Sequence, residues 1–179
     1  MAGTMDEAAG SGGLAAFDSL MRQHERLVLV TALRLLGNLA DAQDASQEVF
    51  LRLYRNLGKL ESDRAMAAWL YRVTVNVCHD VRRKRPVSAP VEDAEGVVAT
   101  GADPAQSAAE GERRRALEMS LRVLGEKERA ALVLRDLEGL STEEVARALG
   151  SSEATVRSQI SKARVKVKDY MERYFRRRI

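Results

Sequence analysis

The sequence predicts an all-α protein made of two small helical domains joined by a flexible acidic linker. Its 179 residues, 45% of them hydrophobic, are enough to build one ordinary core or two small ones. Aromatic residues make up only 4% of the chain, which disfavours a β-sandwich or a β-barrel. Ala, Leu, Arg and Glu are abundant, and apolar residues recur at three- and four-residue spacing, as in helices that bury one face.

Charge and composition divide the chain into segments. The net charge is +4 over residues 17–85, −6 over residues 86–112 and +7 over residues 113–179. All three prolines fall in the acidic segment, which is typical of a linker. The Gly-rich residues 1–13 are expected to be a disordered tail, so the predicted domains are residues 14–85 and 113–179.

The first domain is expected to contain three helices. The first stops at Gly37, which suits a left-handed C-cap. Asp41 is the expected N-cap of the second helix, which ends near Gly58. The third helix follows a polar loop over residues 61–64 and runs to a basic cluster that ends at Arg85.

One face of this third helix carries an aromatic ring, an amide and several bases. Spacings of three and four residues place on it Trp69, Arg72, Asn76, His79 and Arg83. Such a face can stack on an exposed nucleic-acid base, bind its edge and hold the neighbouring phosphates. The alternative, a half-buried Trp beside solvated Arg side chains, stays open on spacing alone.

The second domain contains the pattern of a helix-turn-helix. Ser141 and Glu144 form a capping box for a helix over about residues 142–149, and Gly150 ends it. Ser151 or Ser152 then caps a second helix. The predicted shared core of the two helices is Val145, Leu149, Val156 and Ile160.

The second helix of this pair is strongly basic. It holds five bases and no acid between Thr155 and Lys168. Arg157, Ser158 and Lys162 are expected to point away from the core, where they can bind base edges or phosphates in a DNA major groove.

Other functional classes lack their signatures. The chain has one cysteine, Cys78, and neither metal-ligand spacing nor convergent catalytic groups, so no enzyme activity, metal or cofactor is expected. His24 is expected to pack in a core, and Cys78 is either a buried small hydrophobe or a redox-sensitive thiol. Without an apolar run of spanning length or a signal-peptide layout, a cytoplasmic protein with no membrane insertion is expected.

Several motifs resemble, in order and spacing, those of the bacterial extracytoplasmic-function (ECF) sigma factors of the sigma-70 family. They are DAQDASQEVFLRLYR (residues 41–55), AWLYRVTVN (68–76), RRK (82–84), LSTEEVA (140–146) and TVRS (155–158). The resemblance covers about residues 17–174. It implies two domains, σ2 and σ4, that bind promoter DNA and core RNA polymerase, the latter through its β′ clamp helices and β flap. An anti-sigma factor is a further implied partner.

The resemblance also implies residue roles, motif by motif. The 41–55 helix resembles the element that docks on the β′ clamp helices, with candidate contacts Asp41, Asp44, Gln47, Glu48, Phe50, Leu51 and Tyr54. The loop 61–67 and the third helix resemble the part that captures the minus-10 element as unpaired DNA, with candidates Ser62, Asp63, Arg64, Trp69, Arg72, Asn76, His79, Arg82 and Arg83. The helix-turn-helix resembles the minus-35 reader, with candidates Ser152, Thr155, Arg157, Ser158, Ser161, Lys162 and Arg164.

The sequence departs from the family pattern at two places. Ala45-Ser46 replaces a larger apolar pair, which affects the strength of polymerase docking, and Ser161 replaces a bulkier side chain, which affects the promoter sequence that is read. The linker of 27 residues, if extended, would reach roughly 90 Å. Its negative charge favours a path through a basic nucleic-acid channel of the polymerase.

The main alternative is a conventional helix-turn-helix repressor or activator that binds duplex DNA as a symmetric dimer. Residues 17–85 would then be its ligand or dimer domain. The face containing Trp69 and Asn76 argues against this alternative, because a duplex reader needs no surface for unpaired bases. A sigma factor does need one, since it stabilises strand separation by holding flipped bases, each stacking contact contributing roughly 1–3 kcal/mol.

Overall fold

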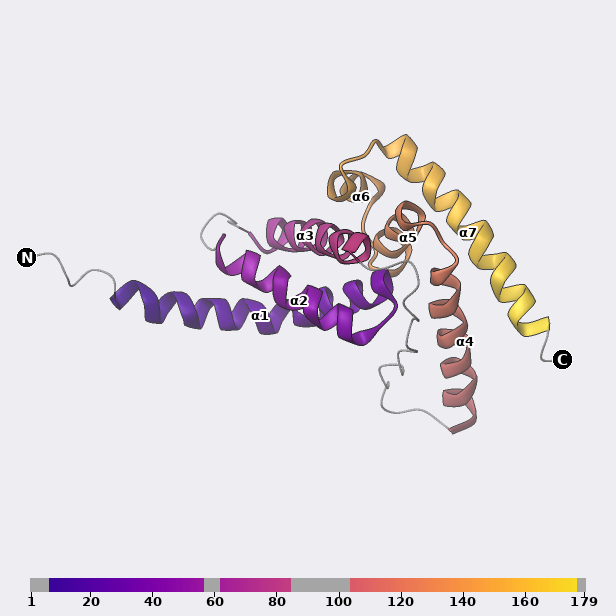
Figure 1. The fold of residues 1–179 in the computed structure, drawn as a ribbon, viewed down its shortest axis with the longest axis horizontal. Coiled ribbons are helices and arrows are strands. Elements are labelled where there is room, and N and C mark those ends of the chain that lie inside the picture. Colours follow the sequence, from indigo (N-terminus) through magenta and orange to yellow (C-terminus); the bar gives the residue numbers. More distant parts are fainter. Residues whose placement is uncertain (1–6, 57–61, 85–103, 177–179) are drawn as a thin grey trace, which may run out of the picture.

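The computed structural model describes residues 7–56, 62–84 and 104–176, and this part of the chain is helical without strands, as predicted (Figure 1). The helices are α1 (Glu7–Leu36), α2 (Leu39–Tyr54), α3 (Asp63–Lys84), α4 (Pro104–Arg122), α5 (Glu126–Leu132), a π-helix (Val133–Leu137), α6 (Thr142–Leu149) and α7 (Glu153–Arg176). Helices α1 to α3 pack against one another and form the N-terminal half. The C-terminal half is α4 to α7, in which α7 packs against α4, α5 and α6.

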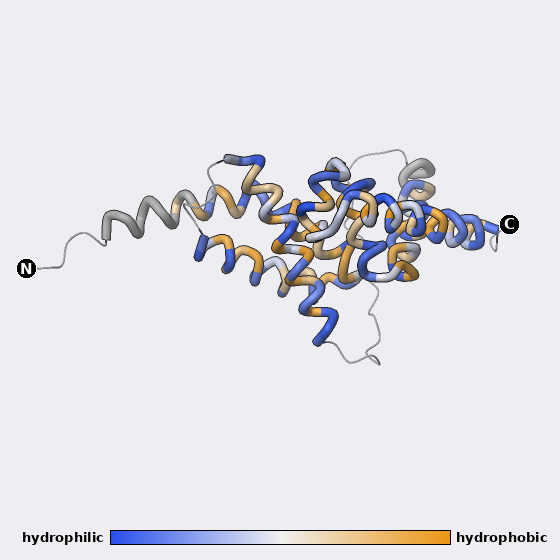
Figure 2. Tube along the Cα trace, turned by 90° about the horizontal axis from the view of Figure 1, so that it is seen from above, coloured by the Kyte–Doolittle hydropathy of each residue, from blue (hydrophilic) through white to orange (hydrophobic). Residues whose placement is uncertain are grey.

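Polar and apolar positions alternate along the helices (Figure 2). This pattern lets each helix bury one stripe and expose another. No helix among the described residues is both long and apolar enough to span a membrane.

The end of α1 confirms the predicted glycine cap. Gly37 has φ +81°, and its N–H donates to the carbonyl of Leu33 at 2.8 Å. A left-handed residue at this position satisfies a helix carbonyl that has no partner within the helix, and glycine adopts the conformation without strain.

The predicted N-cap of α2 was wrong by three residues. Asn38, not Asp41, caps the helix, and its Oδ1 accepts from the Asp41 N–H at 2.8 Å. Asp41 completes the motif, because its carboxylate accepts from the Asn38 amide at 2.7 Å. The two side chains form a reciprocal pair like a capping box, so the acid lies one turn inside the helix.

Several predicted boundaries also differ. α1 begins at Glu7, so residues 7–13 of the expected tail are helical, and α2 ends at Tyr54 rather than near Gly58, which lies outside the described residues. α3 begins at Asp63, so most of the expected loop 61–67 is helix.

The linker expectation was wrong for residues 104–112, which are part of α4. Proline is tolerated as a first helical residue because its missing N–H has no partner there, and the Ala, Gln and Glu that follow favour a helix. Residues 85–103 of the connection lie outside the described part of the chain.

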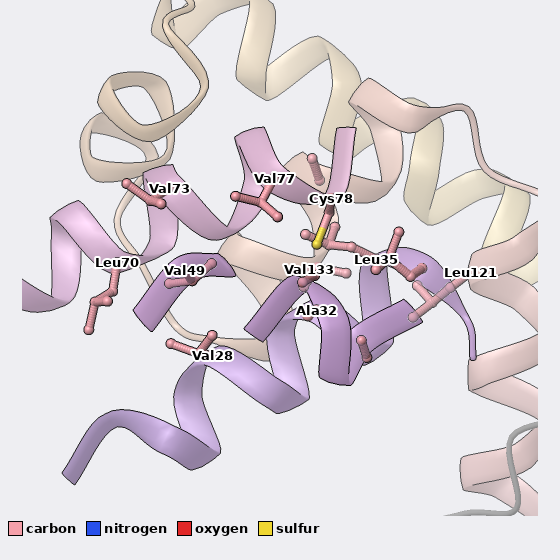
Figure 3. Packing of buried hydrophobic residues seen from close by; sticks show 14 of the residues in the cluster. Val28, Ala32, Leu35, Val49, Leu70, Val73, Val77, Cys78, Leu121 and Val133 are labelled. Atoms are coloured by element: carbon pink, nitrogen blue, oxygen red, sulfur yellow. The ribbon is translucent and has the colours of Figure 1, made fainter. Parts of the chain in front are cut away.

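One hydrophobic core runs through both halves. Val28, Val49 and Leu70 are fully buried between α1, α2 and α3. The same cluster continues through Leu121 of α4 and Val133 of the π-helix. Figure 3 shows side chains from both halves in this cluster. The two halves therefore pack directly on each other, and we call this contact the seam.

The helix-turn-helix is confirmed in detail. The Ser141 hydroxyl accepts from the Glu144 N–H at 3.2 Å, and the Glu144 carboxylate accepts from the Ser141 N–H at 2.9 Å. Gly150 ends α6 with φ +58°, and Ser152 caps α7 by accepting from the Thr155 N–H at 3.1 Å. Val145, Val156 and Ile160 are buried in a second, smaller core, with Leu149 packed against it.

Arg129 joins the two halves through a buried guanidinium. It is 4% exposed and donates to the carbonyl of Leu35 at 3.0 Å, at the end of α1. It also donates to the carbonyls of Leu121, Arg122 and Leu124, at 2.6, 3.2 and 3.0 Å, where α4 ends. Burial lowers the pKa of Arg129 to about 10, so the side chain stays charged at neutral pH.

Replacing Arg129 by Met should lower the free energy of unfolding by about 2–5 kcal/mol, because buried carbonyls at two helix ends lose their donor. Urea denaturation measures this change. The control is Arg22→Met, whose ion pair with Asp18 is exposed and lies within α1, and which should change stability by less than about 0.5 kcal/mol. Equal losses in the two variants would contradict the joining role of Arg129.

Candidate nucleic-acid interfaces

The predicted face on α3 is present as a mostly exposed surface. Arg72, Asn76, His79 and Arg83 are exposed, and Trp69 is half-buried, with its ring against the first core. The opposite side of the helix is buried through Leu70, Val73, Thr74 and Val77. The core therefore fixes which way α3 faces and holds Trp69 at the border between core and surface.

The N-terminus of α3 carries three further predicted residues. Ser62 caps the helix, since its hydroxyl accepts from the Ala65 N–H at 3.2 Å, and Asp63 lies in the first turn. The Arg64 guanidinium donates to Glu144 of α6 at 3.0 Å. Ser62 therefore has a local structural role, and Arg64 contacts the other half.

The C-terminal part of α3 carries several bases and one buried thiol. Arg83 pairs with Asp80 at 3.4 Å, and Arg82 is half-buried. Cys78 is 2% exposed, and burial raises the pKa of its thiol to about 12, although Arg82 opposes the shift. Cys78 therefore packs as a small apolar side chain, the first of the two predicted alternatives.

His24 is also buried, as predicted. It is 6% exposed in the N-terminal half, and burial lowers its pKa, although Asp63 opposes the shift. Its side chain therefore belongs to the core and not to the α3 face.

The outer face of α7 displays most of the predicted duplex-reading residues. Exposed side chains on it are Thr155, Arg157, Ser158, Ser161 and Lys162. Buried Val156, Ile160 and Ala163 lie on the opposite side and fix the rotation of the helix. Arg157 pairs with Glu153 one turn earlier, at 2.5 Å, and this contact lies within α7.

Arg164 differs from the other predicted readers. Its guanidinium makes two hydrogen bonds to Asp136, at 2.7 and 2.8 Å, which raise its pKa. On the other flank, Lys166 donates to Glu128 at 2.7 Å, and this bond lowers the pKa of the Glu128 carboxyl. The two pairs brace α7 against α5 and the π-helix, so Arg164 has a structural role here.

The predicted polymerase contacts on α2 fall into two groups, one exposed on the surface and one buried or bound to α2 itself. Asp44 and Gln47 are exposed, and Leu51 and Tyr54 are 52% and 49% exposed although both are apolar in character. Phe50, the other candidate contact on this helix with an apolar ring, is 8% exposed and belongs to the core, so it is not part of this exposed surface.

The remaining two α2 residues of the predicted set, Asp41 and Glu48, contact their own helix or its cap. Asp41 holds Asn38, and Glu48 accepts from Arg52 at 2.7 Å.

The α3 face and the first turns of α7 line one cleft of about 390 Å³. Asn76, His79 and Arg82 of α3 lie on one wall, and Thr155 and Gln159 of α7 lie on the other. His79 contacts Glu126 of α5 at 3.3 Å. Of the predicted minus-35 set, only Thr155 lines this cleft, so the outer face of α7 with Arg157 and Lys162 lies outside it.

Sequence reasoning missed the residues that make these contacts between the halves. Glu138 accepts from Arg34 at 2.6 Å and from the Tyr71 hydroxyl at 3.3 Å, and burial and this carboxylate raise the pKa of Tyr71 to about 12. The only available signal was Arg129 at the head of the apolar run Ala130–Leu134.

Within the described residues, no group of three or more potential metal ligands lies together.

Comparison with known proteins identifies both halves. Residues 20–86 match the model of sigma-70 region 2, and residues 114–167 match that of sigma-70 region 4. The ECF RNA polymerase sigma factor SigE of Mycolicibacterium smegmatis is 35% identical over 94% of this chain, which spans 66% of that relative. The RNA polymerase sigma-H factor of Pseudomonas aeruginosa is 33% identical, with 88% of this chain and 87% of that protein covered.

The chain belongs to the ECF sigma factors. It is a sigma factor that acts with RNA polymerase in promoter recognition and transcription initiation. The structure of CnrH in complex with the cytosolic domain of CnrY has the same fold, with 27% identity and a TM-score of 0.63, and covers 93% of this chain and 94% of that one. The α1–α3 bundle is thus region 2, and the helix-turn-helix lies in region 4.

The exposed apolar residues of α2 generate a prediction about polymerase binding. Leu51→Asp or Asp44→Lys should weaken binding of core RNA polymerase about tenfold or more, with little change in thermal midpoint, because neither side chain is buried. Fluorescence anisotropy with purified core enzyme measures the affinity. Phe50→Ala is the contrasting variant and should lose about 3–5 kcal/mol of stability. Normal polymerase binding by both surface variants would remove α2 from the interface.

Proposed function

We propose that the α3 face of this sigma factor captures the minus-10 element as unpaired DNA. The observation that supports the proposal is the order of groups on one helix face: a half-buried Trp69, then exposed Arg72 and Asn76, then bases toward the end of the helix. The ring offers a stacking surface, the amide a partner for a base edge, and the guanidinium groups partners for phosphates.

We further propose that α7 reads the minus-35 element as duplex DNA. A helix-turn-helix places its second helix in the major groove with its N-terminal residues against the bases. Arg157, Ser158 and Lys162 lie on the outer face of this helix. Arg164 is left out of the reading set because it braces α7 through Asp136.

In this proposal the chain performs no chemistry of its own. The polymerase supplies the catalysis, and the sigma factor contributes binding energy to strand separation. An anti-sigma factor as partner, contact with the β flap and a cytoplasmic location are also proposed, on the family resemblance.

Asn76→Ala should impair promoter opening more than polymerase binding, because only opening exposes the bases that the amide would bind. Permanganate footprinting of promoter thymines, with core enzyme at saturation, measures opening. The control is Gln23→Ala, which removes an exposed amide from α1, away from this face. If the Asn76 variant opened promoters as well as the Gln23 variant, the capture role of this face would be wrong.

Arg157→Ala should weaken binding to a cognate minus-35 duplex by about 1–3 kcal/mol, and more than it weakens binding to random duplex. Arg147→Ala is a matched control, because each arginine forms an ion pair within its own helix and the two have similar exposure, 64% and 63%. Competition binding at fixed salt compares the two duplexes. Equal losses on cognate and random DNA would reduce Arg157 to a phosphate contact.

A further inference from the structure

The first turn of α7 holds exposed polar side chains in pairs. The Ser152 hydroxyl accepts from the Thr155 N–H at 3.1 Å and shares a hydrogen bond with the Thr155 hydroxyl at 2.9 Å. The Arg157 guanidinium donates through Nη2 to Oε2 of Glu153 at 2.5 Å. Glu153 lies outside the predicted minus-35 set, but it binds the arginine that we propose as a base reader.

This ion pair directs Arg157 toward the end of α7 that a helix-turn-helix presents to the bases. Long side chains in an α-helix lean toward its N-terminus, and a residue four positions earlier lies on the same face. Glu153 is the first residue of α7, so its carboxylate holds the guanidinium beside the N-terminal turn. The pair thereby restricts a side chain that would otherwise sample many rotamers.

The pair leaves donors on Arg157 for a base. A guanidinium has five N–H donors, and Glu153 accepts from Nη2. A bidentate contact with guanine takes two donors, one for O6 and one for N7. Arg157 can therefore be held by Glu153 and bind a guanine at the same time.

The negative charge of Glu153 also acts against the alternative contact of Arg157, which is a phosphate. Phosphates line the major groove and attract arginine without regard to sequence. A carboxylate beside the guanidinium repels a phosphate from that position. The side chains of Arg157 and Glu153 are 63% and 45% exposed, so the pair contributes little to folding stability. Its effect is therefore expected on the choice between a base and a phosphate.

Helix α6 contains a second ion pair of the same spacing. Arg147 pairs with Glu143 at 3.4 Å, and their side chains are 64% and 67% exposed. In a helix-turn-helix the first helix crosses the DNA backbone, whereas the second enters the groove. Glu143 therefore carries the same charge as Glu153 in the same type of pair, but its arginine is not a proposed base reader.

We propose that Glu153 is a positioning residue for promoter recognition. Its carboxylate holds the Arg157 guanidinium toward a guanine edge of the minus-35 element and keeps it from a phosphate. Glu153 thereby sets the discrimination between base pairs through Arg157, without a base contact of its own. This role rests on the proposed function of α7, because it requires Arg157 to read a base.

The test uses the full-length protein assembled with core RNA polymerase. Promoter duplexes that differ by one base pair of the minus-35 element are compared by competition binding at fixed salt. The base pair that Arg157 reads is the one whose replacement weakens binding by wild type but not by Arg157→Ala. Glu153→Ala should reduce discrimination at this base pair about fivefold and leave discrimination at the other positions unchanged.

Affinity for a duplex with a scrambled minus-35 element is the second readout. Glu153→Ala should bind this duplex at least as tightly as wild type, because it has lost a charge that repels phosphates. Weaker binding to the cognate and scrambled duplexes alike would indicate a purely structural role and overturn the proposal. Glu153→Gln keeps an oxygen that accepts from Arg157, so it should lose only about twofold in discrimination.

Glu143→Ala is the matched control, because it removes the same charge from the pair on α6. It should keep wild-type discrimination at every position of the minus-35 element. The double variant Glu153→Ala with Arg157→Ala should discriminate like Arg157→Ala alone, because Glu153 acts through Arg157. A further loss in the double variant would mean that Glu153 acts independently, which is contrary to a positioning role.

The single variants distinguish failure of the positioning role from failure of the proposed reading. If Arg157→Ala loses discrimination at one base pair and Glu153→Ala does not, the positioning role is wrong and the minus-35 assignment of α7 stands. If Arg157→Ala keeps wild-type discrimination at every base pair, Arg157 reads none of them, and both the reading and the positioning are wrong.

Discussion

The guanidinium of Arg129 lies where the C-terminal ends of α1 and α4 converge. Each helix end has carbonyl groups without partners inside the helix, and these ends carry the negative pole of the helix dipole. A planar group with five donors can satisfy several carbonyls at once, and its charge complements both dipoles. Arg129 uses this geometry on Leu35, Leu121, Arg122 and Leu124. Arg129 therefore ties the start of α5 to the end of α1 and to the end of α4.

The two proposed DNA-binding faces, on α3 and α7, each lie opposite a buried stripe of their own helix. α3 presents its polar face because Leu70, Val73 and Val77 are held in the core. α7, about 36 Å long at 1.5 Å per residue, is fixed by Val156 and Ile160 beneath it and by ion pairs on both flanks. In both helices the core determines which side chains face outward. The residues proposed to bind DNA are consequently positioned by the packing of the opposite helix face.

Structural features that depend on residues close together in the sequence could be predicted. The capping box at Ser141, the glycine ends at Gly37 and Gly150, and the face of α3 depend on neighbours within about one helical turn. Features that the sequence did not predict depend on partners distant in sequence or on differences between adjacent residues. The exposure of Leu51 beside buried Phe50, the capture of Arg164 by Asp136, and the contacts of Glu138 with α1 and α3 have no local signal. Residues 104–112 were assigned to the linker because they contain a proline, a glycine and two acids. Their alanines, glutamine and glutamates also favour a helix, and they form the start of α4.

The shared core also has a consequence for exchanging parts between sigma factors. Two family models divide this chain neatly, which invites chimaeras that join one region 2 to another region 4. Yet the carbonyls of Leu35 and Gly37, at the end of α1 in the first region, accept from Arg129 and Arg122 of the second. A transplanted region 4 without Arg129 would leave the buried carbonyl of Leu35 unsatisfied. The two regions can therefore bind separate DNA elements and still depend on each other for stable folding. A working hybrid of this protein must keep the residues that make the contacts between the two halves.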